Sequence, residues 1–222
     1  MPHQSATYSP RHAVILANPN PGSFCGLVAD AYCDAVRACG QNALVRDLYE
    51  LGFDPVLKTV ERPGDFEFAL SADVVAELDA IRTSDIFVLI FPIWFGMPPA
   101  MMIGYIQRVL GAGISVKQFQ SGNAETFLHD KRLVSICTSG TSKTWLNHQK
   151  QVESLKTLMG DYLVHGLGFR SHEELLLSET SSDLDQMYVD KIVDDVAYRA
   201  RQICSEIATE RSGEILIDHG KL

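Results

Sequence analysis

The sequence of 222 residues lacks the features that mark several large classes of protein. Its 19 basic residues are outnumbered by 28 acidic ones, which gives a formal net charge of -9. Nucleic acid is therefore not an expected partner, because phosphate binding requires a clustered basic surface. Internal repeats, low-complexity blocks and linker-like stretches are also missing. The chain is long enough to bury a substantial core, and its composition is that of an ordinary globular protein.

Cysteine is scarce, and no two cysteines show the CxxC spacing. They are Cys25, Cys33, Cys39, Cys137 and Cys204. A disulfide scaffold or a metal site is therefore not expected, and a reducing compartment, the cytoplasm, is predicted. The first residues, MPHQSATYSPR, contain no apolar stretch like that of a signal peptide. We expect residues 1–11 to form a disordered arm, residues 12–208 a single domain and residues 209–222 a C-terminal tail.

Charged residues are absent from one long segment, residues 86–107, which contains the motif FPIWFGMPP. Its length would allow a membrane span. Pro92, Pro98 and Pro99 argue against a span, because each removes a backbone hydrogen-bond donor and interrupts a helix. No stable membrane insertion is therefore expected. The segment divides instead into a buried strand, an exposed turn and a helix that starts at the two adjacent prolines.

Continuous apolar runs predict five buried strands. They cover residues 12–18, 43–48, 85–91, 132–139 and 173–179. Helical spacing of apolar residues predicts five helices. They cover residues 28–39, 73–82, 98–110, 152–162 and a range from about 184 into the 200s. Strands that are apolar on both faces indicate a doubly wound α/β fold, with a five-stranded parallel sheet in the order 2-1-3-4-5 and helices on both faces.

Two loops should meet where ligands bind in this architecture, beyond the carboxyl ends of the strands at the point where strand order reverses. They are NPNPGSF, residues 18–24, and FPIWFGMPP, residues 91–99. The first precedes a helix N-terminus, whose free amide groups favour a phosphate, and it contains Gly22 and Ser23. It is neither a GxGxxG nor a GK[ST] loop, and a simple turn with a helix cap would explain its spacing equally well.

The second loop carries two large aromatic residues beside a glycine. Trp94 and Phe95 follow a strand end, in a segment whose backbone must be exposed. Aromatic rings stack on flat ligands, while backbone N–H and C=O groups satisfy the polar edge of such a ligand. A planar ligand that bears a phosphate would fit both loops. The alternative is that these two rings only fill the core.

Four segments resemble the flavodoxin-like NAD(P)H:quinone oxidoreductases, which include the DT-diaphorases, the modulators of drug activity and the ancillary oxidoreductase subunits of potassium-efflux systems. They are VILANPNPGSF, DLYELGFDPVL, the run from Ser71 to Leu110, and VSICTSG, and they cover most of residues 13–140. The third is the most specific, because the pattern P-x-W-[FYW]-x-x-x-P-A leads into G-[WY]-[IF]-x-R-V. The resemblance implies a flavodoxin-like fold, FMN or FAD as cofactor, NAD(P)H as electron donor and a homodimer.

The resemblance also implies the residues of the flavin site. Those around the flavin phosphate would be Asn18, Ser23, Phe24 and Cys25. Those along the isoalloxazine ring would be Pro92, Ile93, Trp94, Phe95 and Gly96. Those closing its pyrimidine side would be Thr138, Ser139 and Gly140. The candidates for the catalytic site are Trp94, Phe95, Trp145 and His148, of which the last two would flank the acceptor.

The activity that the resemblance implies is ping-pong hydride transfer from NAD(P)H to quinones, or to azo or nitro compounds, with the flavin carrying the chemistry. Residues 94–96 would contact flavin N5 or O4, and residues 138–140 its N1/O2 edge, where negative charge develops on reduction. Residues 53–68 are a candidate contribution to the partner's substrate site. Two alternatives from other classes remain: a flavodoxin-type electron carrier and a flavin-binding ancillary subunit of a membrane transporter.

For three titratable residues near the predicted site, a structural role competes with a chemical one. His148 could donate a proton to a reduced acceptor, yet its position equally suits a solvated residue at a helix start. Cys25 lies at a helix N-terminus, which lowers the pKa of a thiol, but packing is its expected role. Cys137, at a strand end, is expected to be a small core residue.

Overall fold

The computed structural model describes residues 8–122, 124, 126–180 and 184–218, with side chains up to residue 210. Its centre is a five-stranded sheet in which neighbouring strands pair in parallel, in the order β2-β1-β3-β4-β5. The strands are β1 (Arg11–Leu16), β2 (Asn42–Asp47), β3 (Ile86–Pro92), β4 (Arg132–Thr138) and β5 (Ser171–Leu177). The predicted doubly wound sheet and its strand order are confirmed.

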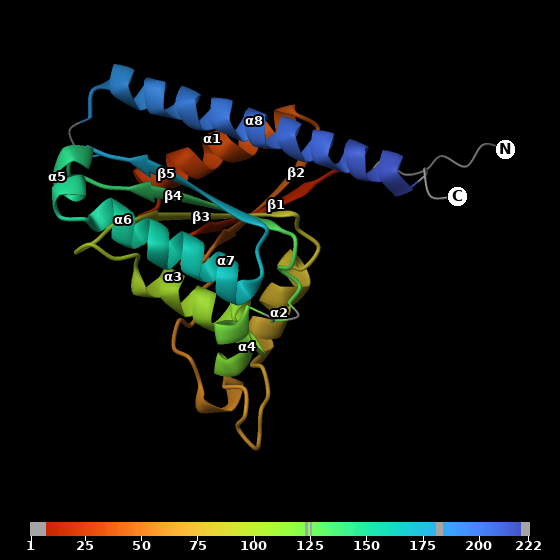
Figure 1. Ribbon diagram of the computed structural model, residues 1–222. Coiled ribbons are helices and arrows are strands. Elements are labelled where there is room, and N and C mark those ends of the chain that lie inside the picture. The colour runs from red at the N-terminus through yellow and green to blue at the C-terminus, as the bar shows by residue number, and fades with distance from the viewer. Residues whose placement is uncertain (1–7, 123, 125, 181–183, 219–222) are drawn as a thin grey trace.

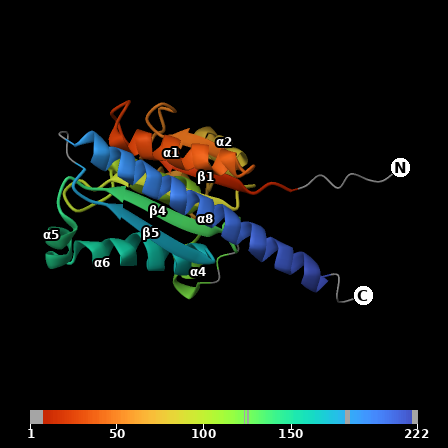
Figure 2. The same cartoon turned by 90° about the horizontal axis from the view of Figure 1, so that it is seen from above.

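Helices cover both faces of this sheet (Figures 1 and 2). One face carries α1 (Phe24–Ala38) and α8 (Gln186–Asp218), which pack against each other. The opposite face carries α2 (Ala72–Ile81), α3 (Ala100–Tyr105), α6 (Gln151–Lys156) and α7 (Tyr162–Leu167). The two remaining α-helices of the described chain are short: α4 (Val116–Ser121) and α5 (Lys143–His148). Each face of the sheet therefore has its own hydrophobic core.

The central strand β3 forms the first part of the uncharged segment. All seven of its side chains are buried. Phe87 and Leu89 enter the core beneath α2 and α3, whereas Val88 and Ile90 enter the core beneath α1 and α8. A strand with helices on both faces has no solvent-facing side, so it reads as a continuous apolar run. Within the described residues, no helix is both long enough and apolar enough to cross a membrane.

Several helices differ from their predicted ranges. The helix expected over residues 98–110 is α3 followed by a π-helical turn, η2 (Ile106–Leu110), and the helix expected over 152–162 is α6 followed by the π-helical η3 (Thr157–Asp161) and α7. The sequence predicted neither α4 nor α5, because six residues are too few to display a helical period. Helix α8 is longer than expected, since residues 209–218 of the predicted tail continue it.

The N-terminal arm was predicted to end at residue 11, where β1 begins. Residues 1–7 lie outside the described residues. The hydroxyl of Tyr8 donates a hydrogen bond of 2.5 Å to the carboxylate of Asp85, and the amide of Arg11 donates one of 2.9 Å to the same group. The last residues before β1 are therefore held against the amino end of β3.

The long connection between β2 and α2 is the orange segment that extends away from the sheet in Figure 1. It contains a short 3-10 helix, η1 (Thr59–Glu61), and is held by the buried guanidinium of Arg108. Arg108 donates to Glu61 at 2.8 and 2.6 Å and to Asp73 at 2.7 and 3.0 Å. Gly104 permits close approach, because a Cβ there would lie 2.3 Å from the carbonyl oxygen of Pro55. The connection is therefore attached to η2 through Arg108 and to α3 through the close approach at Gly104.

Candidate functional site

The loop after β1 ends at a well-capped helix N-terminus. The Oγ of Ser23 accepts a hydrogen bond of 3.2 Å from the amide of Gly26, and Gly22 adopts a positive φ of 78° that favours glycine. The amides of Phe24 and Cys25, in the first turn of α1, have no backbone acceptor among the described residues. This loop therefore presents free amide groups, a hydroxyl hydrogen and the positive end of a helix dipole to an anion.

Asn18 and Cys25 hold this loop from within. The Oδ1 of Asn18 accepts a hydrogen bond of 3.0 Å from the amide of Asn20. The thiol of Cys25 is buried and lies 3.3 Å from the hydroxyl of Thr138, which ties the loop to the end of β4. Burial raises the pKa of Cys25, and hydrogen bonds to Thr138 and Asn18 offset only part of that rise. A reactive thiolate is therefore disfavoured, and the geometry gives Cys25 the expected packing role.

An exposed turn follows β3. Trp94 and Met97 exchange two backbone hydrogen bonds of 2.9 and 3.0 Å. Phe95 and Gly96, between them, have φ values of 51° and 79°, and positive φ at both central positions is typical of a type I′ turn. Trp94 is 43% exposed and Phe95 is fully exposed. The alternative that these two rings only fill the core is therefore wrong.

Backbone hydrogen bonds hold the three predicted segments together at the carboxyl ends of the strands. The amide of Ile93, just after the buried Pro92, donates to the carbonyl of Thr138 at 2.7 Å, and the amide of Ala17 donates to the carbonyl of Ile90 at 3.0 Å. The segments that meet are residues 18–25, 92–96 and 138–140. They lie at the carboxyl ends of β1, β3 and β4, where doubly wound sheets bind their ligands.

The loop after β4 is partly closed on itself. Thr138 and Ser139 are buried, and the Oγ of Ser139 lies 2.8 Å from the hydroxyl of Thr141. Gly140 is exposed, and a Cβ placed there would meet no atom within 4 Å. The Thr138 side chain therefore contacts Cys25 of α1, the Ser139 side chain bonds within its own loop, and the open part of this loop is the backbone at Gly140.

Helix α5 follows that loop and carries the two remaining candidates. Ser142 caps the helix by accepting a hydrogen bond of 3.3 Å from the amide of Trp145, whose ring is 54% exposed. His148 is exposed at the last position of α5, so it lies at a helix end instead of the helix start that its sequence position suggested. Its Nδ1 lies 3.3 Å from the side-chain amide of Gln149.

One residue near the turn, Gln151, was not indicated by any sequence pattern. This residue begins α6, and its side-chain amide donates a hydrogen bond to the carbonyl oxygen of Gly96. The two residues are 55 positions apart, and no local pattern relates them. Only the packing of α6 beside the end of β3 reveals the contact.

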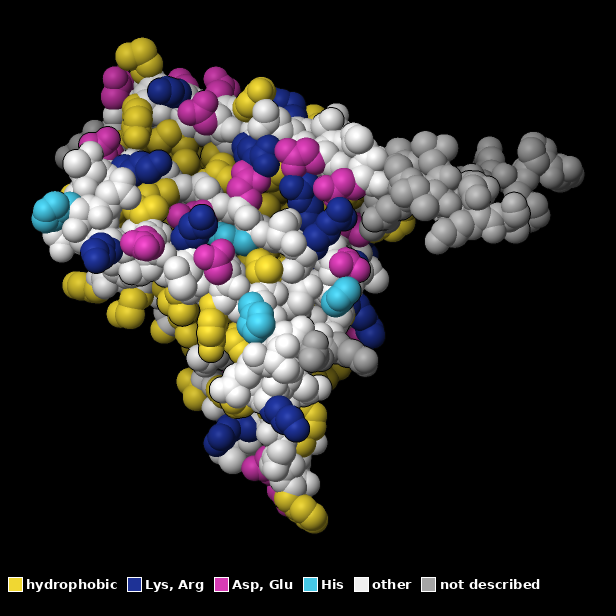
Figure 3. Space-filling view, in the orientation of Figure 1, with side chains coloured by type: hydrophobic (Ala, Val, Ile, Leu, Met, Phe, Trp, Pro, Cys, Tyr) yellow, Lys and Arg dark blue, Asp and Glu magenta, His cyan; other side chains and the backbone are white. Residues whose placement is uncertain are grey.

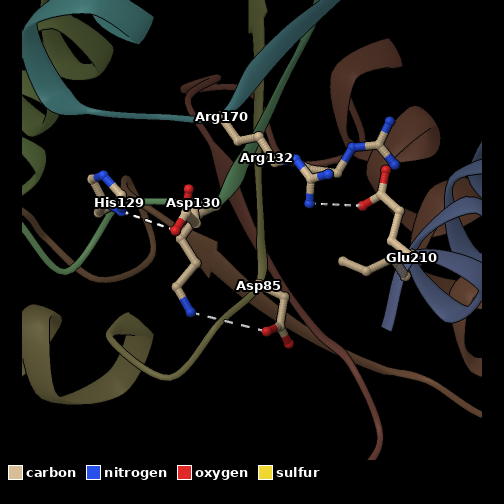
Figure 4. A pocket seen from close by; sticks show the side chains of 8 residues that line it. Asp85, His129, Asp130, Arg132, Arg170 and Glu210 are labelled. Carbon is tan, nitrogen blue, oxygen red and sulfur yellow. Dashed lines mark hydrogen bonds and ion pairs between the residues drawn. The ribbon is translucent and has the colours of Figure 1, made fainter. Parts of the chain in front are cut away.

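A polar cavity of about 310 Å³ lies at the opposite end of the sheet, at the amino ends of β3, β4 and β5 (Figure 4). The side chains labelled in the figure are Asp85, His129, Asp130, Arg132, Arg170 and Glu210. Besides a histidine, the cavity lining has three acidic and three basic side chains, so neither charge is in excess. Ion pairs cross the region, such as Lys131 with Asp85 at 3.9 Å and Arg170 with Glu210 at 3.4 Å. The cavity is therefore a weaker candidate for an anionic ligand than the capped end of α1.

A second cavity, of about 460 Å³, is mainly apolar and lies on the face of α3 that is turned away from the sheet. Residues from the long connection, α3, α4, η3 and α7 line it, and they include Leu57, Ile103, Phe119, Met159 and Leu163. Among the described residues, no group of three His, Cys, Asp or Glu side chains could hold a metal ion.

The sheet order, the capped helix N-terminus after β1 and the aromatic turn at the point of strand reversal together define a flavodoxin-like α/β protein. The sequence profile of the Flavodoxin_2 family, described as a flavodoxin-like fold, matches residues 10–195. The match covers well over half of the chain, so the chain belongs to this family.

Two curated relatives are similar to part of this chain. An "Uncharacterized NAD(P)H oxidoreductase" of Haemophilus influenzae is 31% identical over 132 residues, which are 59% of this chain and 65% of the relative. The "NAD(P)H dehydrogenase [quinone] 1" of Cavia porcellus is 27% identical over 169 residues, which are 68% of this chain and 58% of the relative. The matched parts span less than two thirds of either relative.

Solved structures share the fold at lower identity. An NAD(P)H:quinone oxidoreductase from Methanothermobacter marburgensis superposes with a TM-score of 0.75 at 22% identity, over 88% of this chain and 98% of the other. An FMN-dependent NADH-azoreductase from Bacillus anthracis, solved in complex with FMN, has a TM-score of 0.63 at 14% identity, over 89% and 99% of the two chains. Both likenesses support the flavodoxin-like fold.

Proposed function

We propose that the protein binds FMN or FAD and, with it, oxidises NAD(P)H and reduces quinones or related azo and nitro compounds. One observation carries the proposal. A capped helix N-terminus with free amides lies beside an exposed aromatic turn at the carboxyl ends of the strands. A flavin has both a phosphate and a flat ring with polar edges. The printed names of the relatives, NAD(P)H oxidoreductase and NAD(P)H dehydrogenase [quinone], support the same activity.

The loop before α1 would hold the flavin phosphate. Ser23 would donate its hydroxyl hydrogen, because its oxygen already accepts from the amide of Gly26. The free amides of Phe24 and Cys25 would donate along the helix axis, where the dipole favours negative charge. Asn18 would keep the loop closed through its bond to the amide of Asn20. The donor set therefore suits a phosphate.

The turn after β3 would bind the ring. The rings of Trp94 and Phe95 are exposed at the end of the sheet and can pack on a flat ligand. The amides of Phe95 and Gly96 have no hydrogen-bond partner among the described residues and can donate to a polar ring edge. Residues Pro92 and Ile93 would border the ring from the strand end, and the backbone at residues 138–140 would face its other edge.

When bound, the flavin supplies the hydride chemistry, and the protein supplies orientation and electrostatic stabilisation. Donors aimed at a polar ring edge favour the negative charge that develops there on reduction. Trp145 and His148 would border the place of the nicotinamide or the acceptor. Their exposure leaves them accessible to a ligand that approaches from solvent.

We expect purified protein to retain FMN or FAD through gel filtration and to show the visible absorbance of a bound flavin. Anaerobic NADPH or NADH should bleach this absorbance, and a quinone should restore it. Steady-state NAD(P)H oxidation that depends on the quinone separates a reductase from an electron carrier, which would show almost none. A protein that retains neither flavin would contradict the proposal.

We also propose a homodimer that forms through the apolar groove beside α3. Figure 3 shows hydrophobic side chains along the lower left edge of the molecule, below α6. Leu158 and Tyr162 border the groove and are about half exposed, and Phe66 in the long connection is fully exposed. A second copy could cover this surface, and the connection would then reach toward the partner's ring site.

We expect Leu158→Glu to weaken or abolish the dimer, because it places a charge in an apolar interface. Multi-angle light scattering on a dilution series should show the mass falling from that of two chains to that of one. The matched control is Met187→Glu on α8, since Met187 is also exposed but lies on the other face of the sheet. Equal masses for both variants at every concentration would contradict this interface.

The five cysteines are free thiols and none of them forms a disulfide. Free thiols persist in a reducing compartment, which supports a cytoplasmic location as part of the proposal. Alkylation of lysed cells with and without prior reduction would test it, since equal labelling means that the thiols are free in the cell.

A further inference from the structure

One side-chain contact joins helix α6 to the aromatic turn. The Nε2 of Gln151 donates a hydrogen bond to the carbonyl oxygen of Gly96. The approach is close, because a Cβ placed on Gly96 would lie 2.7 Å from the Oε1 of Gln151. The absence of a side chain at residue 96 therefore allows Gln151 to reach the turn.

The backbone is unusual on both sides of this contact. Phe95 and Lys150 have φ values of 51° and 57°, and they are two of the four non-glycine residues with positive φ in the described chain. L-residues with bulky side chains rarely adopt this conformation, and it persists only where the surroundings impose it. Lys150 redirects the chain between α5 and α6, so that Gln151 becomes the first residue of α6. The residue before each member of the bonded pair therefore has a conformation that the surrounding structure must hold in place.

The contact acts on the part of the turn that has free donors. The amides of Trp94 and Met97 are used within the turn, whereas those of Phe95 and Gly96 have no partner among the described residues. The Gly96 carbonyl and the Met97 amide belong to one peptide plane. Gln151 holds this plane from outside the turn, while the hydrogen bond from Met97 to Trp94 holds it from within.

We propose that Gln151 is a positioning residue, which fixes the turn so that the free amides of Phe95 and Gly96 face the bound flavin. The inference rests on the proposed flavin function and adds a specific residue to it. An amide held toward the ring edge favours the reduced, more negative flavin over the oxidised one. Release of the turn should therefore weaken binding of reduced flavin more than binding of oxidised flavin.

The first test uses the flavin-free protein and the substitution Gln151→Met, which keeps the length of the side chain and removes its donor. Amide hydrogen exchange of Trp94 and Met97 should become about tenfold faster, since one of the two restraints on the turn is lost. The matched control is Gln149→Met, two residues earlier in the chain, where the side chain is exposed and its amide lies 3.3 Å from Nδ1 of His148. It should leave both exchange rates within twofold of the wild type.

The second test measures the reduction potential of the flavin in the loaded protein. Gln151→Met should lower the affinity for reduced flavin relative to oxidised flavin about tenfold, which shifts the two-electron midpoint by about 30 mV to more negative values. Gln149→Met should leave the midpoint unchanged. If Gln151 had only a structural role, its replacement would weaken the binding of oxidised and reduced flavin equally and would not move the midpoint.

Three results would overturn the inference. One is unchanged exchange of Trp94 and Met97 in Gln151→Met, which would mean that the side chain does not order the turn. Another is faster exchange with an unchanged midpoint, which would mean that the flavin does not use the ordered amides. The third is the same response in Gln149→Met. If the wild type binds neither FMN nor FAD, the proposed function itself fails, and the exchange rates still decide whether Gln151 orders the turn.

Discussion

We expect Ser23→Asp to lower the affinity for FMN at least about 100-fold while the fold is preserved. Aspartate is as good a helix N-cap as serine, so the hydrogen bond from Gly26 and the start of α1 should survive. The new carboxylate would lie beside the flavin phosphate, and two like charges about 4 Å apart near a protein surface repel each other by roughly 4 kcal/mol. Titration monitored by quenching of flavin fluorescence measures the loss.

Two controls make this result specific for the phosphate. Riboflavin has the same ring and no phosphate, so its affinity should change little in Ser23→Asp. Ser115→Asp repeats the substitution at the cap of α4, where the serine accepts a hydrogen bond of 3.3 Å from the amide of Gln118. Ser115 also borders the apolar groove, so FMN binding is compared at a protein concentration at which this variant and the wild type have equal mass, and it should then equal that of the wild type. An equal loss for FMN and riboflavin would show that the phosphate does not lie at Ser23.

The largest expected effect on stability is that of Arg108→Met, which should lower the free energy of unfolding by about 3–5 kcal/mol. The Arg108 and Glu61 side chains are almost fully buried, with 0% and 1% exposed. The substitution would leave the carboxylate of Glu61 buried without its cation, and it would also remove the contact with Asp73 and the cation–π contact with Phe53. Urea denaturation at one fixed protein concentration measures the change.

The exposed pair of Arg82 and Asp79 provides the control, because both side chains are more than half exposed. Arg82→Met should change the free energy of unfolding by less than about 1 kcal/mol. If Arg108→Met lowered the free energy of unfolding by no more than Arg82→Met does, the buried network would contribute little to stability. In that case the long connection would be held mainly by its apolar contacts.

Acid should reduce the difference between wild type and Arg108→Met. The hydrogen bonds from Arg108 lower the pKa of Glu61 to about 2 from its ordinary value of 4.5. A carboxyl whose pKa is lowered in the folded state stabilises the protein fully above its unfolded pKa, and this contribution is lost as pH falls toward the folded pKa. The wild type should therefore lose stability between about pH 4.5 and 2 on this account, and the variant should not.

Several features of the site followed from sequence. The strand order placed residues 18–24 and 91–99 at one edge, and the structure joins these segments through backbone hydrogen bonds. Trp94 and Phe95 were expected on an exposed segment because a glycine and prolines follow a strand end, and both are exposed. Such expectations succeed because burial and chain reversal leave a local pattern of apolar residues, glycine and proline.

Other features of the site had no local pattern. The pKa of Cys25 depends on burial beneath Thr138, 113 positions away, and this burial outweighs the effect expected from its place at a helix N-terminus. Short helices such as α5 are too brief to show a period, so the position of His148 at a helix end was missed. The role of Gln151 depends on a contact with Gly96 that the sequence does not encode locally.

The sequence by itself determined the class of fold, the order of the strands and which loops meet at the carboxyl ends of the strands, because each depends on periodic burial and on turn residues within short segments. Only the tertiary structure decided which donors remain free, which thiol is buried and which side chain holds the aromatic turn. Those properties arise where residues far apart in the chain meet, as Arg108 does with Glu61, 47 positions away, and Gln151 with Gly96. Such contacts depend on how the helices pack on the sheet, which no single segment specifies.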